Sequence, residues 1–424
     1  MPLSLAQWSL TVTLFVGALS PPLIGRLGAG TRRRTVTIIC LALVSIGTLM
    51  AALPLGFEAL VAGRALQGLG FGITPLAFAA ARDQLPEAQA RRALATISLA
   101  NVMSAGLGFP IAAVIADLLG VKGAFWIAFG FTLVSVAVAL KVIPPGAADG
   151  DGPVDWIGAL LLGAATFGVL LAISRAEVWG YGSTALRAVL GLSAVLLVAT
   201  VCWLLRRTNP LVDLRVAMRP GVLGAHVAGL LGGVGMYLMM ATIMVLVQAG
   251  PEADGLGRSV TWAGFMLVPY AVASVVGNRI ALVLGPVIGP DLLLPLGCLA
   301  FGASNLVLAL WHDQLWQIAL AMLIGGIGSG TTFNSIPWLV VRVVPAAETG
   351  SALALNVVVR MLGFAMGSAL SVAVLAHFAE DGHPNDTGYS GAAWLGLLIC
   401  VVAAAVCAWQ ARTARVALDL PTVR

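Results

Sequence analysis

Long apolar stretches, separated by short polar segments, run along almost the whole chain. A bilayer core requires about 20 helical residues. Thirteen stretches are long enough to cross it, namely residues 3–25, 35–53, 57–81, 93–117, 122–143, 155–175, 184–205, 221–248, 260–284, 288–310, 315–341, 349–377 and 391–411. They do not alternate apolar with polar positions, as the strands of a membrane barrel would. The pattern predicts an all-α protein, a polytopic membrane helical bundle of about 13 transmembrane helices.

The composition excludes a soluble protein. Only 10% of the 424 residues are charged, whereas a typical soluble domain has about 25%. The mean hydropathy is +1.00. A soluble core could not bury this much apolar surface, which excludes soluble enzymes, nucleic-acid-binding modules and disordered chains. The sequence also lacks a GxxxxGK[ST] loop, which excludes the common phosphate-binding site of ATPases.

Basic residues divide unevenly between the two sides of the predicted bundle. When the loops are assigned alternately to two sides, one side carries most of the 23 lysines and arginines. Cytoplasmic loops are enriched in these residues, so this side is predicted to be cytoplasmic. An odd number of spans then places the C-terminus inside and the N-terminus outside, in a multi-pass protein of the cell membrane. The first stretch lacks the basic start and cleavage site of a signal peptide, so we expect a retained span.

Two polar stretches divide the chain. The clearest linker is PPGAADGDGP at residues 144–153, and a second polar stretch covers residues 206–220. We therefore predict three parts: a five-helix half-bundle over 1–143, a linker with an inserted helix pair over 144–210, and a six-helix half-bundle over 211–424. Two nearly equal halves are typical of transporters, in which the substrate site lies between the halves near the membrane midplane.

Four motifs occur in a defined order along the chain. The loop after the first span reads PLIGRLGAGTRRR, and the third span carries GRALQGLG from residue 63. The fourth span carries GLGFPIAA from residue 106, and the twelfth carries NVVVRMLG from residue 356. Together with the run VDWIG from residue 154, these motifs resemble the major facilitator superfamily, and within it the fourteen-span drug:proton antiporter branch.

The resemblance implies both a fold and a mechanism. It implies two helical half-bundles with an inserted pair, and export of small amphipathic or drug-like molecules by proton antiport with alternating access. The expected partners are a small-molecule substrate, protons and the lipid bilayer, with no cofactor and a monomeric state. Conformational roles are implied for Gly25, Arg26, Arg32, Arg33, Arg34, Gly68, Gly70, Gly106, Gly108, Pro110, Gly363 and Gly367.

The sequence also departs from the family pattern. The family's loop motif follows its second helix, whereas here it follows the first span, so the family's first helix is predicted to be absent. That helix usually carries a membrane-embedded Asp linked to proton coupling. Ala29 stands where the loop motif has Asp, and Ala112 and Ala113 stand at glycine positions of the antiporter motif. Either Met1 is not the true start, or the protein is a diverged and impaired member.

Two arginines lie inside predicted spans, where a charge costs about 2.5–3.5 kcal/mol on insertion scales. Arg64 must therefore face the bundle interior, and Gln67 at i+3 can supply an acceptor on the same helical face. Glu58 and Asp117 lie towards the same predicted outer side. Arg64 is interpreted either as a group that tunes a carboxylate or holds an anionic substrate group, or as a structural anchor.

Arg360 lies near the predicted mid-bilayer, with Asn356 one turn before it. It either lines a cavity or contacts carbonyls between helices. The residues predicted for the substrate cavity and its coupling are Arg64, Gln67, Asn356, Arg360, Glu58 and Asp117. Further candidates for a cavity lining are the polar residues Tyr237, Gln248, Asn305 and Asn334.

No residue pattern favours catalysis or metal binding. His377 and His383 flank acidic residues in a loop, where a solvated polar segment is the preferred interpretation over a metal site. The five cysteines contain no C-x-x-C pair and are interpreted chiefly as small buried apolar residues. We therefore predict a transporter rather than an enzyme. Two rivals stay open: a non-coupled facilitator or impaired member of the same fold, and a membrane subunit without transport activity.

Overall fold

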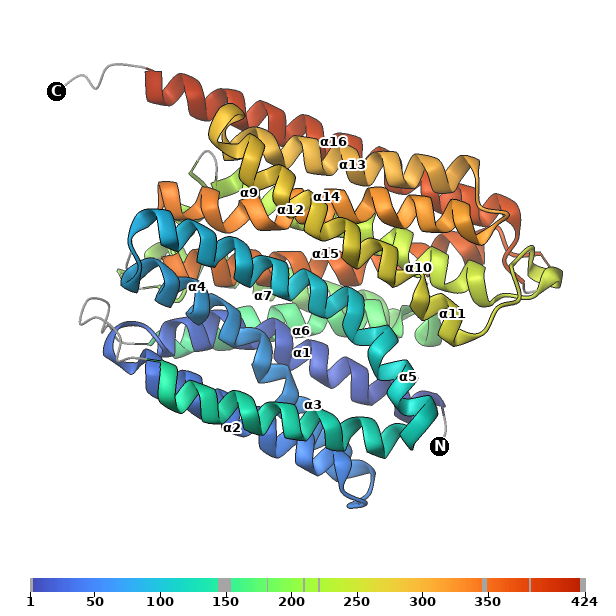
Figure 1. Ribbon diagram of the computed structural model, residues 1–424, viewed down its shortest axis with the longest axis horizontal. Helices are drawn as coiled ribbons and strands as arrows, with labels where there is room; N and C mark the ends of the chain where they lie inside the picture. The colour runs from blue at the N-terminus through green and yellow to red at the C-terminus, as the bar shows by residue number, and fades with distance from the viewer. Residues whose placement is uncertain are drawn as a thin grey trace. The chain divides into compact units, whose positions relative to one another are not determined.

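The computed structural model describes residues 3–143, 154–180, 182–208, 210–219, 222–344, 349–380 and 383–419 (Figure 1). All thirteen predicted segments are helical. Within the described ranges, the β-type pairing consists of one isolated bridge between Glu380 and His383. The all-α fold class predicted from the sequence is therefore confirmed.

The chain divides into two compact units. The first unit comprises Met1–Ala90, Ile115–Ala217 and Val344–Val358, and the second comprises Arg91–Val114, Met218–Val343 and Val359–Arg424. These units are not identical to the three parts predicted from the sequence, which stay a prediction. The helices α5 and α15 each contribute residues to both units.

The first unit begins with closely packed helices. In chain order these are α1 (Leu3–Leu27), η1 (Gly30–Arg32), α2 (Arg33–Ala52), α3 (Phe57–Gly68), η2 (Leu69–Gly72) and α4 (Ile73–Gln84). Gly47 of α2 and Gly63 of α3 face each other, and a Cβ on either would lie 2.5 Å from the other's carbonyl oxygen. Small residues at such positions let helix backbones approach closely.

The predicted third span is not one continuous α-helix. The 3-10 segment η2 separates α3 from α4, and it lies where the sequence has glycine at positions 68, 70 and 72. Glycine has a low helix propensity. A Cβ on Gly72 would lie 2.8 Å from the Cβ of Ile24 in α1. Close packing against α1 therefore requires the residue type that weakens the helix.

The next helix, α5 (Glu87–Val142), contains two of the predicted spans. Its backbone is non-helical at Gly120, where φ is 74° and ψ is 166°. Glycine adopts such a positive φ without the steric penalty that other residues incur. Gly120 therefore separates two successive helical segments that correspond to the predicted spans 93–117 and 122–143.

The inserted pair consists of α6 (Trp156–Trp179) and α7 (Thr184–Arg206), which pack against each other. Asp155 is buried and caps α6, because its Oδ1 accepts a hydrogen bond from the Gly158 N–H at 2.9 Å. The same oxygen accepts from Nε1 of Trp203 in α7 at 3.1 Å, and Oδ2 accepts from the Leu211 N–H at 3.4 Å. One carboxylate thus connects both inserted helices to the segment before α8 (Leu214–Ala217).

Replacement of Asp155 by alanine is expected to lower the melting temperature of the purified protein. Loss of a helix N-cap costs about 1 kcal/mol. The half-buried Trp203 indole N–H would also lose its acceptor, which adds at most the cost of about 1–3 kcal/mol for a fully buried donor. Asp313→Ala is a suitable control, because Asp313 is exposed. Equal melting temperatures for both variants would contradict the structural role of Asp155.

The second unit contains most of the remaining helices. They are α9 (Val222–Val227), η3 (Ala228–Gly232), α10 (Gly233–Gln248), η4 (Pro251–Ala253), α11 (Val260–Phe265), α12 (Leu267–Ile288), α13 (Pro290–Leu310), α14 (Leu315–Val343), α15 (Thr349–His377) and α16 (Asp386–Asp419). α14 packs against α12 and α13, and α16 lies along α13 (Figure 1). The segment η3 is a π-helix, which interrupts the predicted span 221–248.

Within the described part of the chain, ten helices are long and apolar enough to cross a membrane. Many of their apolar side chains face outwards: Val287 is 81% exposed, Leu118 77% and Phe131 74%. An apolar surface of this kind is unfavourable in water but suits contact with lipid hydrocarbon. The protein is therefore a multi-span membrane protein.

Candidate functional site

Arg64 belongs to a hydrogen-bonded chain in the first unit. Its Nη1 donates to Oε1 of Gln67 at 2.8 Å, as the i+3 spacing on α3 predicts. Nε2 of Gln67 donates to Oγ1 of Thr48 at 3.2 Å, and this hydroxyl donates to the Val44 carbonyl at 2.8 Å. The chain of contacts connects the Arg64 guanidinium to the backbone of α2 and fixes its direction.

Small and polar residues of α1 position the backbone around Arg64. The Thr13 hydroxyl donates to the Arg64 carbonyl at 3.1 Å, and the Ser20 hydroxyl donates to the Gly68 carbonyl at 3.1 Å. A Cβ on Gly68 would lie 2.7 Å from the Thr13 carbonyl oxygen. α3 is therefore held against α1 at Arg64 itself and one turn further on, at Gly68. A Cβ on Gly70 would lie 3.7 Å from a methyl carbon of Val44, which is an ordinary van der Waals distance.

Neither carboxylate that was predicted to accompany Arg64 is found paired with it among the described residues. Glu58 is exposed in the first turn of α3. The side chains of Asp117 and Pro110, and the surroundings of Gly106, lie outside the described part of the structure. Across the described residues, the ion pairs found are Arg33 with Asp83 and His312 with Asp386, so Arg64 forms none there.

Arg360 of α15 lies beside a row of aromatic side chains in the second unit. The centre of its guanidinium lies 5.1 Å from the ring centroid of Phe333 in α14. Phe333 contacts Phe364 edge to face at 6.2 Å, and Phe364 stacks on Tyr237 of α10 at 4.6 Å. We call Tyr237, Phe364 and Phe333 the aromatic row. It ends at Arg360 on one side and at Tyr237, which is 38% exposed, on the other.

Arg360 has no acidic partner among the described residues that would balance its charge. Its Nε is buried and has no hydrogen-bond partner, and no described carboxylate pairs with it. A cation–π contact contributes about 0.5–2 kcal/mol. An arginine near the bilayer centre costs about 2.5–3.5 kcal/mol on insertion scales. The contact with Phe333 therefore offsets only part of this cost. If Arg360 had the structural role considered above, it would contact carbonyl groups between helices. No hydrogen bond from Arg360 to a carbonyl is found among the described residues.

The backbone around Arg360 is unusually compact. A Cβ on Gly363 would overlap the Leu230 carbonyl oxygen of the π-helix η3, and a Cβ on Gly367 would overlap the Val234 carbonyl oxygen of α10. Both glycines predicted from the sequence therefore bring α15 into direct backbone contact, Gly363 with η3 and Gly367 with α10, the helix that carries Tyr237. π-helical turns occur frequently at functional sites.

The other polar candidates differ in their surroundings. Asn356 is buried in the first unit. Asn305 donates through Nδ2 to the Phe301 carbonyl at 2.9 Å, while its Oδ1 is buried without a hydrogen-bond partner. Both amide atoms of Asn334, next to Phe333 in α14, are buried without a hydrogen-bond partner. A buried amide without partners costs free energy, which keeps Asn334 a candidate for ligand contact.

The loop motif connects several ends of helices in the first unit. Gly25 and Arg26 belong to the last turns of α1, and Arg32 ends η1. Nη2 of Arg33 lies 2.7 Å from Oδ2 of Asp83 in α4. Nη2 of Arg34 donates to the Leu140 carbonyl at 2.8 Å, near the end of α5.

Arg82, next to Asp83 in α4, holds the start of α15. Its Nη2 donates to the Val344 carbonyl at 3.0 Å, and its Nη1 donates to the Thr349 hydroxyl. Burial lowers the pKa of the Arg82 guanidinium, and the Asp83 carboxylate opposes this shift. The sequence analysis missed both residues. Their signal was an adjacent pair of opposite charges at the end of a predicted span.

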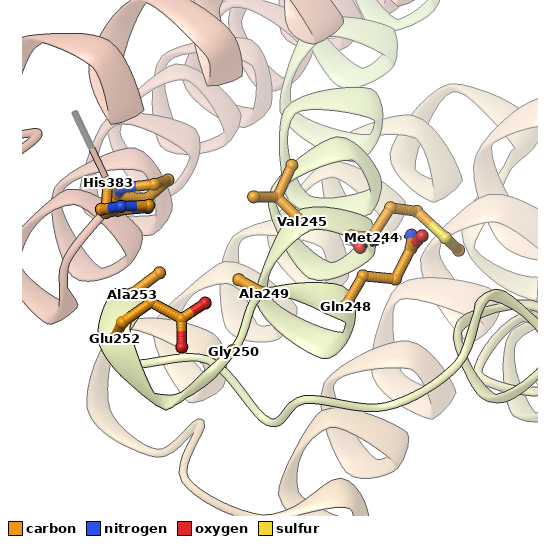
Figure 2. Close-up of a pocket in the computed structure, with 9 residues that line it drawn as sticks. Met244, Val245, Gln248, Ala249, Gly250, Glu252, Ala253 and His383 are labelled. Carbon is orange, nitrogen blue, oxygen red and sulfur yellow. Dashed lines mark hydrogen bonds between the residues drawn. The ribbon is translucent and has the colours of Figure 1, made fainter.

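A pocket of about 400 Å³ lies at the end of α10 and around η4 (Figure 2). It is lined by Met244, Val245, Gln248, Ala249, Gly250, Glu252, Ala253, His383 and Pro384. Figure 2 shows His383 on the side opposite Gln248, with Glu252 on the η4 loop. No group of three or more potential metal ligands occurs among the described residues. Gln248, predicted as a cavity residue, thus lines a pocket at a helix end rather than near Arg360.

The fold and its arginine-bearing helices define a multi-span α-helical membrane protein. A family model described as "Major Facilitator Superfamily" matches residues 1–231. The chain belongs to the Major Facilitator Superfamily, and it is a transporter rather than an enzyme. Members of this superfamily bind small-molecule substrates. The superfamily resemblance seen in the sequence is confirmed.

Individual relatives share the family at low identity. The "Triacylglyceride transporter" of Mycobacteroides abscessus is 27% identical over 371 residues, which cover 82% of this chain and 70% of that protein. "Multidrug resistance protein 3" of Bacillus subtilis is 22% identical over 380 residues, covering 88% and 73%. The crystal structure of the human organic anion transporter MFSD10 aligns with a TM-score of 0.65 at 15% identity, covering 93% and 83%. This structural similarity supports the fold.

Proposed function

We propose that this transporter exports small amphipathic molecules across the cell membrane by alternating access. The observation that carries the proposal is Arg360, a charged side chain in a membrane helix beside an aromatic row and without an acidic partner among the described residues. A charge inside a membrane protein normally marks a substrate or ion pathway. Arg64, directed by Gln67, is the corresponding group of the first unit.

The drug:proton antiporter branch is the proposed subgroup. It is supported by the order of the four motifs and by similarity to a protein named for multidrug resistance. The proposal places the C-terminus in the cytoplasm and the N-terminus outside, with a monomer as the transporting unit. The bacterial relatives support a cell-membrane location.

Proton antiport is the proposed energy source, and a non-coupled facilitator is the rival. Among the described side chains, the carboxylates lie in loops or near the ends of helices, as Glu58, Asp83 and Asp155 do. This observation favours the rival, because coupling in membrane transporters commonly uses a carboxylate within a span. An impaired member and a membrane subunit without transport activity are the remaining alternatives.

Transport in inverted membrane vesicles tests the proposal. Vesicles that contain the protein are expected to accumulate members of a panel of amphipathic dyes when a proton gradient is imposed. Dissipation of the gradient by a protonophore should abolish accumulation in an antiporter. Equilibration of dye that is faster than in empty vesicles, but insensitive to the gradient, would support the facilitator. Vesicles indistinguishable from empty ones across the panel would overturn the transport proposal.

Arg64→Ala is expected to abolish transport while the protein still inserts into the membrane. The substitution removes the guanidinium that Gln67 directs, but it leaves the backbone contacts of Arg64 with Thr13 in place. Dye transport and the amount of membrane-inserted protein measure the two effects separately. Arg187→Ala is the matched control, because Arg187 is exposed in the first turn of α7. Normal transport by a well-expressed Arg64→Ala variant would contradict the assigned role.

A further inference from the structure

The two membrane arginines differ in how their charge is satisfied. Nη1 of Arg64 donates to the Gln67 side chain, which is itself hydrogen-bonded to Thr48. Arg360 has no comparable acceptor among the described residues, and its Nε is buried without a partner. Among the described residues, therefore, neither a hydrogen-bond acceptor nor a carboxylate is paired with the charge of Arg360.

Next to Arg360 lies an apolar row that leads from the buried Phe333 through the half-buried Phe364 to Tyr237, which is 38% exposed. Starting at Arg360, the side chains of Phe333, Phe364 and Tyr237 follow one another at ring distances of 6.2 and 4.6 Å. All four residues belong to the second unit, and they come from α10, α14 and α15. A ligand that satisfies both features needs an anionic group at one end and an apolar body at the other.

We propose that the second unit recognises amphipathic organic anions, with the acidic group at Arg360 and the apolar body along the aromatic row. The inference rests on the proposed function, because it names the substrate class of the same site. Carboxylate, sulfonate and phosphate groups fit the planar guanidinium, which can donate two parallel hydrogen bonds to such a group. The guanidinium already packs on the Phe333 ring, which fixes its position.

Organic cations fit this arrangement poorly. Aromatic rings alone attract cations through their electron-rich faces. Here, however, a cationic group on the row would approach the positive charge of Arg360. Among the described residues, no carboxylate forms an ion pair with Arg360 that would reduce this repulsion. The Arg360 side chain therefore discriminates between organic anions and organic cations. The aromatic row contacts the apolar body, which both kinds of ligand share.

Three fluorescent probes with one apolar body test the inference. We would use a dansyl group on an undecyl chain that ends in a carboxylate, a hydroxyl or a trimethylammonium group. The full chain is placed in phosphatidylcholine nanodiscs, and binding to empty nanodiscs is subtracted. The unmodified protein is expected to bind the carboxylate probe at least tenfold more tightly than the trimethylammonium probe, with the hydroxyl probe between them.

Variants then assign this preference to Arg360. Arg360→Gln should remove the preference, and Arg360→Lys should keep its sign with weaker binding, because lysine retains the charge without the planar donor pair. Arg279→Gln, which removes an exposed arginine of α12 in the same unit, should leave the preference unchanged. Equal or tighter binding of the trimethylammonium probe by the unmodified protein would overturn the inference, and this comparison does not depend on the folding of any variant. An unchanged preference in Arg360→Gln would overturn it as well.

The same probes separate this inference from the proposed function. Vesicle transport of the probes with a preference for the cationic one would overturn the anion inference and leave the transporter proposal standing. Anion-selective binding without transport of any probe or dye would support the inference and overturn the transporter proposal. Transport that follows the order carboxylate, hydroxyl, trimethylammonium supports both.

Discussion

Gly367→Ala is expected to destabilise the protein strongly and to abolish its transport. The added Cβ would overlap the Val234 carbonyl oxygen and lie 2.9 Å from the Leu238 amide nitrogen. Both atoms belong to the backbone of α10, so neither can move aside as a flexible side chain can. Overpacking costs about 1–3 kcal/mol and sometimes more. The melting temperature of the purified protein and its transport rate in vesicles measure the two effects.

Gly108→Ala is the matched control, because Gly108 belongs to another of the glycine motifs. Among the described residues, no atom lies within 4 Å of the position that a Cβ on Gly108 would occupy. Alanine is favoured over glycine in a helix by about 1 kcal/mol, so this variant is expected to be as stable as the unmodified protein or more stable. If both alanine variants melted at the same temperature, the close contact between α15 and α10 would not govern stability.

The helical segments could be predicted from the sequence because a bilayer imposes a minimum length on each of them. The interruptions could not be predicted. η2 lies at glycines that resemble those inside unbroken helices, and its position depends on the packing of Gly72 against Ile24. The π-helix η3 also lies at a tertiary contact, between Leu230 and Gly363. Helix length is a property of one segment, whereas these interruptions depend on its neighbours.

The candidate site shows the same division between local and distant contacts. The hydrogen bond between Arg64 and Gln67 could be predicted, because residues at i and i+3 share a helical face. The row beside Arg360 could not, because Tyr237 and Phe333 come from helices that lie far apart in the sequence. An aromatic residue in an apolar run gives the same signal whether it faces lipid or a binding site.

Asp83→Ala is expected to cause the second large loss of stability. The Arg33 side chain is 7% exposed, and its ion pair with Asp83 joins the start of α2 to the end of α4. Nε and Nη1 of Arg33 are buried without hydrogen-bond partners. Among the described residues, the Asp83 carboxylate is the group paired with the Arg33 guanidinium, through Nη2. Removal of one partner of a fully buried ion pair costs about 3–5 kcal/mol. A smaller loss is expected here, because Arg33 is buried but Asp83 is accessible to solvent. Thermal melting of the purified protein measures the loss.

The double variant Arg33→Leu/Asp83→Leu distinguishes loss of the pair from the burial of an unpaired charge. Replacement of both partners by apolar residues is often neutral or stabilising, so the double variant is expected to melt above Asp83→Ala. Glu87→Ala, at an exposed acidic position four residues further on, is expected to melt like the unmodified protein. A double variant that is less stable than Asp83→Ala would show that the pair stabilises the protein beyond relief of a buried charge. A fully stable Asp83→Ala variant would mean that Arg33 finds another acceptor or reaches water once Asp83 is gone.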